Sequence, residues 1–333
     1  MASAQRTTKQ RALTLLIGCM LVAASAAQSL PEPPARSATE LESAGERVDE
    51  ALRDRVLVRD DARARFIAAQ LAYSEPFAFV RDLAAAFARE PREMLYLASL
   101  ASACMERTLP VRPECATTDY VAQWSFRDVD NALPWLLLAE RARRRNDLAT
   151  MAAHVSKAAQ QPRFDDYWSR RLAAYWKEFE PLARPMERGG AARLARAYAS
   201  SWPVMMETTI LSICTAERMA ADAALLASCG SVGKTMAQHG STFLARRIGL
   251  ALLERSAPAD GKAALTRDGT APYQQLLARC GDSDAQVLTG LESTDPRERA
   301  RATELAVAVV VDGIATDEPT ACERQVARLA RTK

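Results

Sequence analysis

Apolar residues recur three and four positions apart along most of this chain, which is the spacing of one helix face. An early helix carries Phe66, Ile67, Leu71 and Tyr73. The stripe after Pro76 comprises Phe77, Val80, Leu83, Ala84 and Phe87, and the stripe after Pro91 comprises Met94, Leu97, Ala98 and Ala101. Proline is favoured in the first turn of a helix, so we expect each proline to begin one. Short connections between such helices predict antiparallel hairpins.

The β-branched run Leu305–Val311 is the segment that most resembles a strand. Asp295-Pro296 before it is a typical helix start, and polar residues continue the helical pattern up to the run. We therefore predict a buried helix there. Alanine makes up roughly a fifth of the chain, well above ordinary usage, and glycines are few at 13, so the composition also favours an all-α fold.

Residues 130–162 have the spacing of a single helical hairpin. Asn146-Asp147 supplies the tight turn, and Pro162 ends the unit. The packing positions are Trp135, Leu138, Ala139, Ala142, Leu148, Val155 and Ala158. This segment resembles a tetratricopeptide repeat, a hairpin of about 34 residues. It departs from that pattern at Met151, where a small residue is usual, and at Asn146, which replaces the turn glycine but tolerates the left-handed conformation.

A second, weaker match lies at 91–127, where Met94, Leu97, Ala98 and Ala101 repeat the spacing of Trp135, Leu138, Ala139 and Ala142. The resemblance implies helical hairpins stacked as a short tetratricopeptide-like array, followed by a helical C-terminal half that contains disulfides and caps the array. The extra residues of the second match fall between Cys104 and Cys115.

The predicted organisation has four parts. They are a signal peptide at 1–27, a Pro-rich linker and leading helix at 28–58, the hairpins at 59–184 and a C-terminal helical region at 185–333. Pro181, Pro185 and Gly189-Gly190 mark the boundary between the last two parts.

The N-terminus has the three parts of a secretory signal. Arg6, Lys9 and Arg11 precede the apolar run Leu13–Ala23, and small residues suited to cleavage end near Ala27. The run is too short to span a bilayer well, and no transmembrane span is expected after cleavage. We expect a periplasmic or secreted protein. In the alternative, Leu16-Ile17-Gly18-Cys19 resembles a lipobox, and lipidated Cys19 would hold the protein on a membrane.

Cleavage changes the charge balance. The whole chain carries 44 basic and 41 acidic residues, and loss of three cations leaves 41 of each. The neutral remainder argues against a nucleic-acid partner. The arginines at 141–145 are interpreted as a solvated helix face, with a patch for an acidic partner as the alternative.

Six cysteines remain after the signal: Cys104, Cys115, Cys214, Cys229, Cys280 and Cys322. An even number in an exported chain predicts disulfides, although fifteen pairings are open. Cys104 with Cys115 is the easiest pair, and Cys280 with Cys322 would clamp a hairpin. Cys214 with Cys229 requires a helix break between them, for which Asp222 is a candidate cap. No zinc spacing is present, and we expect no metal.

Sequence motifs for chemistry are weak. Gly230–Thr235 resembles the end of a phosphate-binding loop, but Ser228 stands where its first glycine belongs, so we expect no nucleotide and interpret Gly230 as a helix C-cap. His239 and Ser241 lack a nucleophile elbow. No catalytic or cofactor-binding residue is assigned, and no cofactor is expected.

An aromatic stripe on the helix predicted after Phe164 is interpreted as core packing, with a concave ligand groove as the alternative. The possible groove residues are Tyr167, Trp168, Tyr175 and Trp176. We therefore expect an exported protein- or peptide-binding or scaffold module of the bacterial cell envelope, rather than an enzyme. The alternative is an exported enzyme that acts on cell-wall or polysaccharide substrates.

Overall fold

The structure is a computed structural model of the 333-residue chain. It describes residues 47, 50–51, 54–56, 58–72, 75–105, 113–201, 205–258 and 261–331. All of these lie in one compact unit, Glu40–Lys333. The expected signal peptide 1–27, its lipidation candidate Cys19 and most of the Pro-rich linker and leading helix expected at 28–58 lie outside the described residues.

All regular structure in the described part is helical, apart from the isolated bridges Asn131–Arg163 and Phe164–Gly240. The first helices are α3 (Ala62–Leu71), α4 (Pro76–Arg89), α5 (Met94–Met105), α6 (Pro113–Ala116), α7 (Tyr120–Arg127), α8 (Ala132–Arg144) and α9 (Leu148–Ala159). Next come α10 (Trp168–Phe179), α11 (Arg188–Ser200), α12 (Met205–Ile213), α13 (Ala216–Ala221), α14 (Ala223–His239) and α15 (Phe243–Ser256). The last are α16 (Lys262–Leu265), the π-helical segment η3 (Thr266–Thr270), α17 (Ala271–Glu292), α18 (Pro296–Ala315) and α19 (Glu318–Ala330).

Short polar side chains set many of the helix starts. Each accepts a hydrogen bond from a backbone N–H of the first turn, which otherwise has no partner within the helix. The capping residues are Asp61, Asp119, Asn131, Asp147, Thr215, Asp222, Thr242, Asp295 and Asp317. The all-α prediction is confirmed, and the run 305–311 lies inside α18 as expected.

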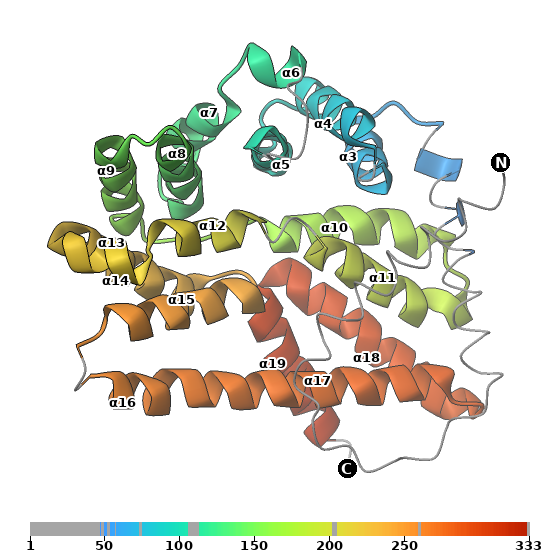
Figure 1. The fold of residues 1–333 in the computed structure, drawn as a ribbon. Helices are drawn as coiled ribbons and strands as arrows, with labels where there is room; N and C mark the ends of the chain where they lie inside the picture. The colour runs from blue at the N-terminus through green and yellow to red at the C-terminus, as the bar shows by residue number, and fades with distance from the viewer. Residues whose placement is uncertain are drawn as a thin grey trace, which may run out of the picture. The chain divides into compact units, whose positions relative to one another are not determined.

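Helices α3 to α9, in the upper part of Figure 1, pack largely on their neighbours in the sequence. The turn between α8 and α9 uses Asn146 in the left-handed conformation (φ 59°), as the sequence predicts. Two further sets of contacts join segments distant in sequence. Helix α14 packs against α9, so the α14–α15 hairpin continues the stack that α8 and α9 begin, while α11 packs against α18.

Two details differ from the sequence prediction. Gly230 is not a C-cap, because α14 continues to His239. Gly189 and Gly190, which were expected to mark the boundary between the last two parts, lie within α11. A Cβ on Gly189 would stand 2.3 Å from Leu291 Cδ2 and 3.2 Å from Thr303 Cα, so this glycine permits α11 to approach α17 and α18 closely.

Candidate functional site

Three disulfides join the six cysteines, and the three pairs are ones that the sequence analysis considered. Cys104–Cys115 links α5 to α6, with Cα atoms 5.4 Å apart. Cys214–Cys229 has a Cα separation of 6.0 Å. The break that this pair requires is present, because Thr215 and Asp222 each cap a new helix between the two cysteines.

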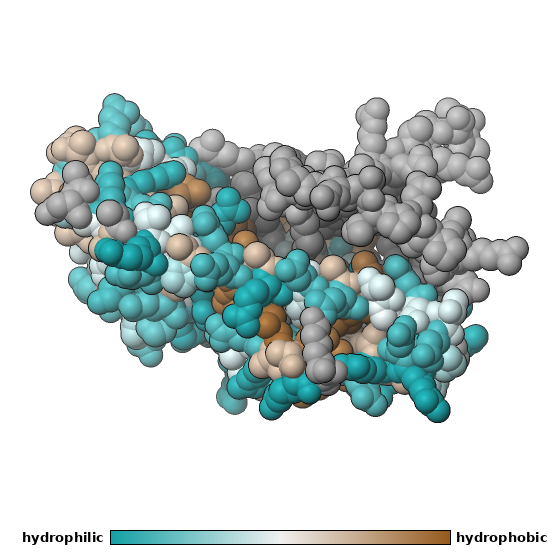
Figure 2. Space-filling model, turned by 90° about the horizontal axis from the view of Figure 1, so that it is seen from below, coloured by the Kyte–Doolittle hydropathy of each residue, from teal (hydrophilic) through white to brown (hydrophobic). Residues whose placement is uncertain are grey.

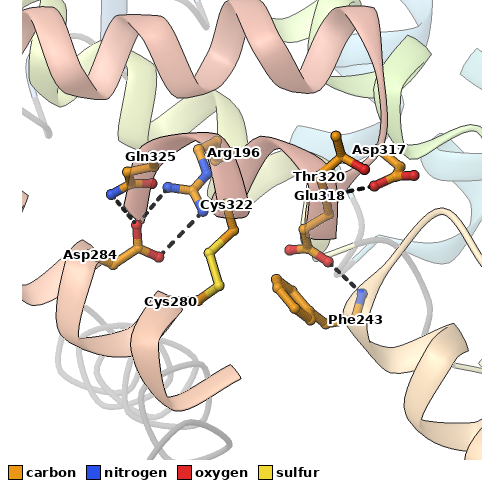
Figure 3. The surroundings of a disulfide bond; sticks show 9 residues. All are labelled: Arg196, Phe243, Cys280, Asp284, Asp317, Glu318, Thr320, Cys322 and Gln325. Carbon is orange, nitrogen blue, oxygen red and sulfur yellow. Dashed lines mark hydrogen bonds and ion pairs between the residues drawn. A yellow bond between two sulfur atoms is a disulfide. The ribbon is translucent and has the colours of Figure 1, made fainter. Parts of the chain in front are cut away.

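Cys280–Cys322 ties α17 to α19, with Cα atoms 5.8 Å apart (Figure 3). Beside it, Arg196 of α11 makes a two-pronged ion pair with Asp284 of α17, at 3.0 and 3.3 Å. Gln325 of α19 donates to the same carboxylate at 3.1 Å. The disulfide and the ion pair together hold three helices at one place.

Most of the repeat-packing residues of the 130–162 hairpin are buried. These are Leu138, Ala139, Ala142, Val155 and Ala158. Trp135 is half-buried, with its ring 6.0 Å from that of His154. The prediction that Leu148 packs inside the hairpin is wrong. Leu148 is 50% exposed, because it is the first residue of α9 and lies at the end of the hairpin. Met151, where the repeat pattern has a small residue, is buried instead.

The aromatic residues considered for a groove lie in the core. Tyr167, Trp168, Tyr175 and Trp176 are at most 6% exposed. Tyr175 contacts Tyr198 at 5.3 Å between ring centroids, and Trp168 Nε1 donates to Ser200 Oγ at 3.0 Å. These four residues therefore present no aromatic face to a ligand, and core packing, the other interpretation, is what the structure shows.

Tyr167 nevertheless has an unusual environment. Its φ of 64° is rare for a large side chain. Its hydroxyl donates to Asp128, which also accepts hydrogen bonds from Trp124 Nε1 (3.3 Å) and Asn131 Nδ2 (2.8 Å). Burial would raise the pKa of Asp128, but these donors together with Arg163 hold the pKa below its ordinary value. The carboxylate is thus a structural acceptor that fastens the segment before α10 to the start of α8.

A second polar network joins α10, α11, α15 and α19. Ser241 Oγ donates to Asp166 Oδ1 at 2.6 Å, and Arg171 pairs with Oδ2 of the same aspartate at 2.6 Å. Glu318 accepts from the backbone N–H of Phe243 at 2.9 Å (Figure 3), and its own N–H donates to Ser241 O. Burial raises the pKa of Glu318.

The network includes Ser241, one of the two residues weighed for a hydrolase. The Ser241 hydroxyl is committed to Asp166, while His239 is exposed at the end of α14. Gly230 and Gly233, from the segment that resembles a phosphate loop, lie in the middle of the same helix. The donors and acceptors here are paired with each other across four elements, which is an arrangement that fixes the fold.

The arginines at 141–145 are mostly tied to acidic residues. Arg143 and Arg144 both bind Glu140, and Arg141 binds Asp119 at 2.6 Å. Ser212 of α12 also donates to Glu140, at 3.0 Å. Burial acts to raise the pKa of Glu140, but these donors lower it to about 2. Glu140 therefore joins α8 to α12 as a carboxylate that is charged at neutral pH.

An open pocket lies between α18 and α19, with a volume of about 340 Å³. Its lining residues are Arg301, Glu304, Leu305 and Ala308 of α18, and Arg328 and Arg331 of α19. The four positions on α18 follow helical spacing and share one face. The two helices are joined by the short turn Thr316–Asp317 and pack together as a hairpin, which brings the first half of α18 beside the end of α19. We call this pocket the arginine groove.

The groove combines cations with an apolar floor. Arg301, Glu304 and Arg331 are exposed, whereas Leu305 and Ala308 are half-buried. Arg328 Nη1 bonds to Asp312 Oδ2 at 2.5 Å. Burial would raise the pKa of Asp312, but Arg328 and Arg324 hold it below its ordinary value. Asp312 is thus charged and fixes the Arg328 guanidinium in place.

Sequence reasoning missed this groove. The i, i+3, i+4, i+7 spacing of residues 301–308 was a signal that these residues share a face. Nothing local, however, identified α19 as the opposing wall.

Large exposed apolar residues are spread over several helices and turns. They are Val58, Phe77, Phe126, Val129, Leu148, Leu277 and Val311. On the face seen in Figure 2, apolar residues form separate small patches between hydrophilic ones. Within the described ranges, no helix is long and apolar enough to cross a bilayer, and no group of three or more His, Cys, Asp or Glu residues is placed to hold a metal ion.

Comparison with known proteins adds no relative. No family model matches the chain, and neither a curated protein nor a solved structure matches it.

Proposed function

We propose that this chain is an exported binding protein of the bacterial cell envelope, which holds a protein or peptide partner in the arginine groove. The observation that carries the proposal is the groove itself, where three arginines, of which Arg328 is held by Asp312, surround a small apolar floor on the surface of a disulfide-linked helical fold. Convergent polar groups around an apolar surface are typical of recognition sites.

Two features support export. The N-terminal sequence has the order of basic, apolar and small residues of a secretory signal. The three disulfides suit an oxidising compartment, where such bonds form and persist. Periplasmic or secreted protein is the location that fits both features, and lipidation at Cys19 would place the same fold on a membrane surface.

The stacked hairpins support a binding or scaffold role. In the proposed interpretation, α8 and α9 form a tetratricopeptide-like unit, whose buried Ala139 and Ala158 permit close helix approach. Helical stacks of this kind commonly serve as binding surfaces. The weaker match at 91–127 corresponds to α5 to α7, closed by the Cys104–Cys115 disulfide.

An exported enzyme is the competing interpretation. Its best support is the pair of acidic residues, Asp166 and Glu318, that meet near Ser241. Both carboxylates already accept hydrogen bonds from within the fold, and neither residue lines the arginine groove. The observations therefore favour binding over catalysis.

Site-specific crosslinking tests the proposal. A photoreactive amino acid at Ala308, on the groove floor, is expected to capture a discrete partner in envelope preparations. The same residue at Gly281 is the control, because a side chain there meets nothing within 4 Å and projects from α17. Equal crosslinking patterns at the two positions, or none at Ala308, would argue against a partner in the groove.

A further inference from the structure

The charges of the arginine groove restrict what it can bind. Three of its six lining residues are arginines and one is a glutamate, so the lining carries a net positive charge. Arginine presents a planar fork of N–H donors that matches a carboxylate in a two-pronged geometry. The first requirement on a ligand is therefore a negative charge.

Arg328 is already held in a defined orientation. Asp312 lies behind it, one helical turn beyond Ala308 on α18, and bonds to its Nη1 atom. A side chain fixed in this way loses less conformational entropy when it binds a second anion. Arg301 on α18 and Arg331 on α19 also line the groove, one from each helix.

The apolar floor of the groove and its one acidic residue, Glu304, determine which kind of anion fits. Leu305 and Ala308 provide an apolar surface that suits the methylene groups of a glutamate side chain. Glu304 would repel a multiply charged phosphate more strongly than a singly charged carboxylate, and it can accept a hydrogen bond from a peptide N–H. A volume of about 340 Å³ admits a short peptide segment rather than a large ligand.

We propose that the arginine groove binds an acidic peptide segment of a partner protein. Its carboxylates pair with Arg301, Arg328 and Arg331, and an aliphatic side-chain stem packs on Leu305 and Ala308. This inference depends on the proposed binding function and identifies the chemistry of the partner.

Binding of labelled peptides to the full chain, with its disulfides formed, tests the inference. A glutamate-rich peptide with one leucine is expected to bind at least about tenfold more tightly than the same peptide with glutamine at every glutamate. Affinity should fall as salt rises, since exposed charges are screened. Equal affinity of the two peptides would overturn the inference.

Reversing the charge of groove arginines tests whether the acidic peptide binds in the arginine groove. The double variant Arg301→Glu and Arg331→Glu is expected to lower the affinity for the acidic peptide at least about tenfold, because like charges then meet in the groove. The matched control, Arg267→Glu with Arg279→Glu, makes the same change in net charge at exposed positions in η3 and α17 and should leave the affinity within about twofold. Equal losses in the two variants would indicate general charge attraction and overturn the assignment.

Two further measurements separate the inference from the proposed function. Inorganic phosphate that displaces the peptide more effectively than free glutamate, or anionic vesicles that bind through Arg301 and Arg331, would show a phosphate or membrane site instead. If a partner is crosslinked at Ala308 but the glutamate-rich and glutamine peptides displace it equally well, the preference for acidic peptides is overturned. The proposed binding function would then still stand. No crosslink at Ala308 would overturn the binding function as well.

Discussion

Gly249 lies directly against the backbone of α14 where α14 and α15 pack together. A Cβ on Gly249 would stand 2.3 Å from the backbone N of Ala237 and 2.7 Å from Gly233 O. Gly233 has the reciprocal relation, with its Cβ position 3.1 Å from Gly249 O. The second glycine of the segment that resembles a phosphate loop thus serves helix packing.

Substitution of Gly249 by alanine should therefore destabilise the protein. The clash is with backbone atoms, so α14 and α15 must separate, at a cost of about 1–3 kcal/mol in the free energy of unfolding. Urea unfolding followed by circular dichroism measures this cost. The control is Gly281→Ala in α17, where the added methyl group meets nothing within 4 Å and should stabilise by about 0.5–1 kcal/mol. A neutral Gly249→Ala variant would contradict the close packing.

Removal of the Cys280–Cys322 disulfide should cost more stability than removal of either other disulfide. It joins residues 42 apart, compared with 11 for Cys104–Cys115 and 15 for Cys214–Cys229. Loop-closure entropy predicts about 4 kcal/mol for the longest loop and about 3 kcal/mol for the others. Paired Cys→Ala variants, compared by thermal unfolding, test the ranking. If all three double variants unfold at the same temperature as the disulfide-bonded wild type, the disulfides make no contribution to stability.

Glu140 should make the protein sensitive to acid. Its pKa is about 2 in the folded state and near 4.5 when unfolded, so the unfolded chain binds a proton first as the pH falls. The stabilisation is present above about pH 4.5 and is lost as the pH falls towards 2, with a total on the order of 3 kcal/mol. In Glu140→Gln, the free energy of unfolding should depend less steeply on pH between 5 and 3. Parallel pH profiles for the two proteins would refute this role.

Glu318 should have the opposite effect on pH dependence. Burial raises its pKa, so the folded state binds the proton more tightly than the unfolded state, and stability falls as the pH rises above the unfolded value. Arg196 favours the charged form and Asp166 opposes it, while Phe243 N–H and the Ser200 hydroxyl donate to the carboxylate.

Replacement of Glu318 by glutamine keeps an oxygen acceptor for Phe243 and removes the charge. The stability of Glu318→Gln relative to wild type should therefore increase from pH 4 to pH 8. Denaturant unfolding at a series of pH values supplies the comparison. A relative stability that decreases over this range would mean that the carboxylate is stabilised by its neighbours more than it is penalised by burial.

Local sequence signals predicted much of the backbone. Asn146 adopts the left-handed turn, and Asp222 caps the helix that lets Cys214 reach Cys229. These features depend on residues within one or two turns of each other, so the sequence shows them directly. Leu148 was misplaced because its spacing suited the hairpin face, although its position at the end of α9 exposes it.

Local sequence signals could not predict the candidate site. The arginine groove requires α19 to lie beside α18, with Arg301 and Arg331 lining it from one helix each. The close approach of Gly249 to Gly233 and the meeting of Asp166 with Ser241 likewise join separate elements. None of these contacts follows from the periodicity of a single helix.

The sequence by itself therefore determined the all-α class, the Asn146 turn and helix starts such as those at Asp222 and Asp295, because backbone geometry constrains them locally, whereas it left the cysteine pairing open. Only the tertiary structure decided that α14 packs on α9 and α11 on α18, that the aromatic stripe is buried, and that arginines from two helices share a groove. Such choices depend on shape complementarity between surfaces distant in sequence, and on which arrangement buries the most apolar area while every buried charge keeps a partner.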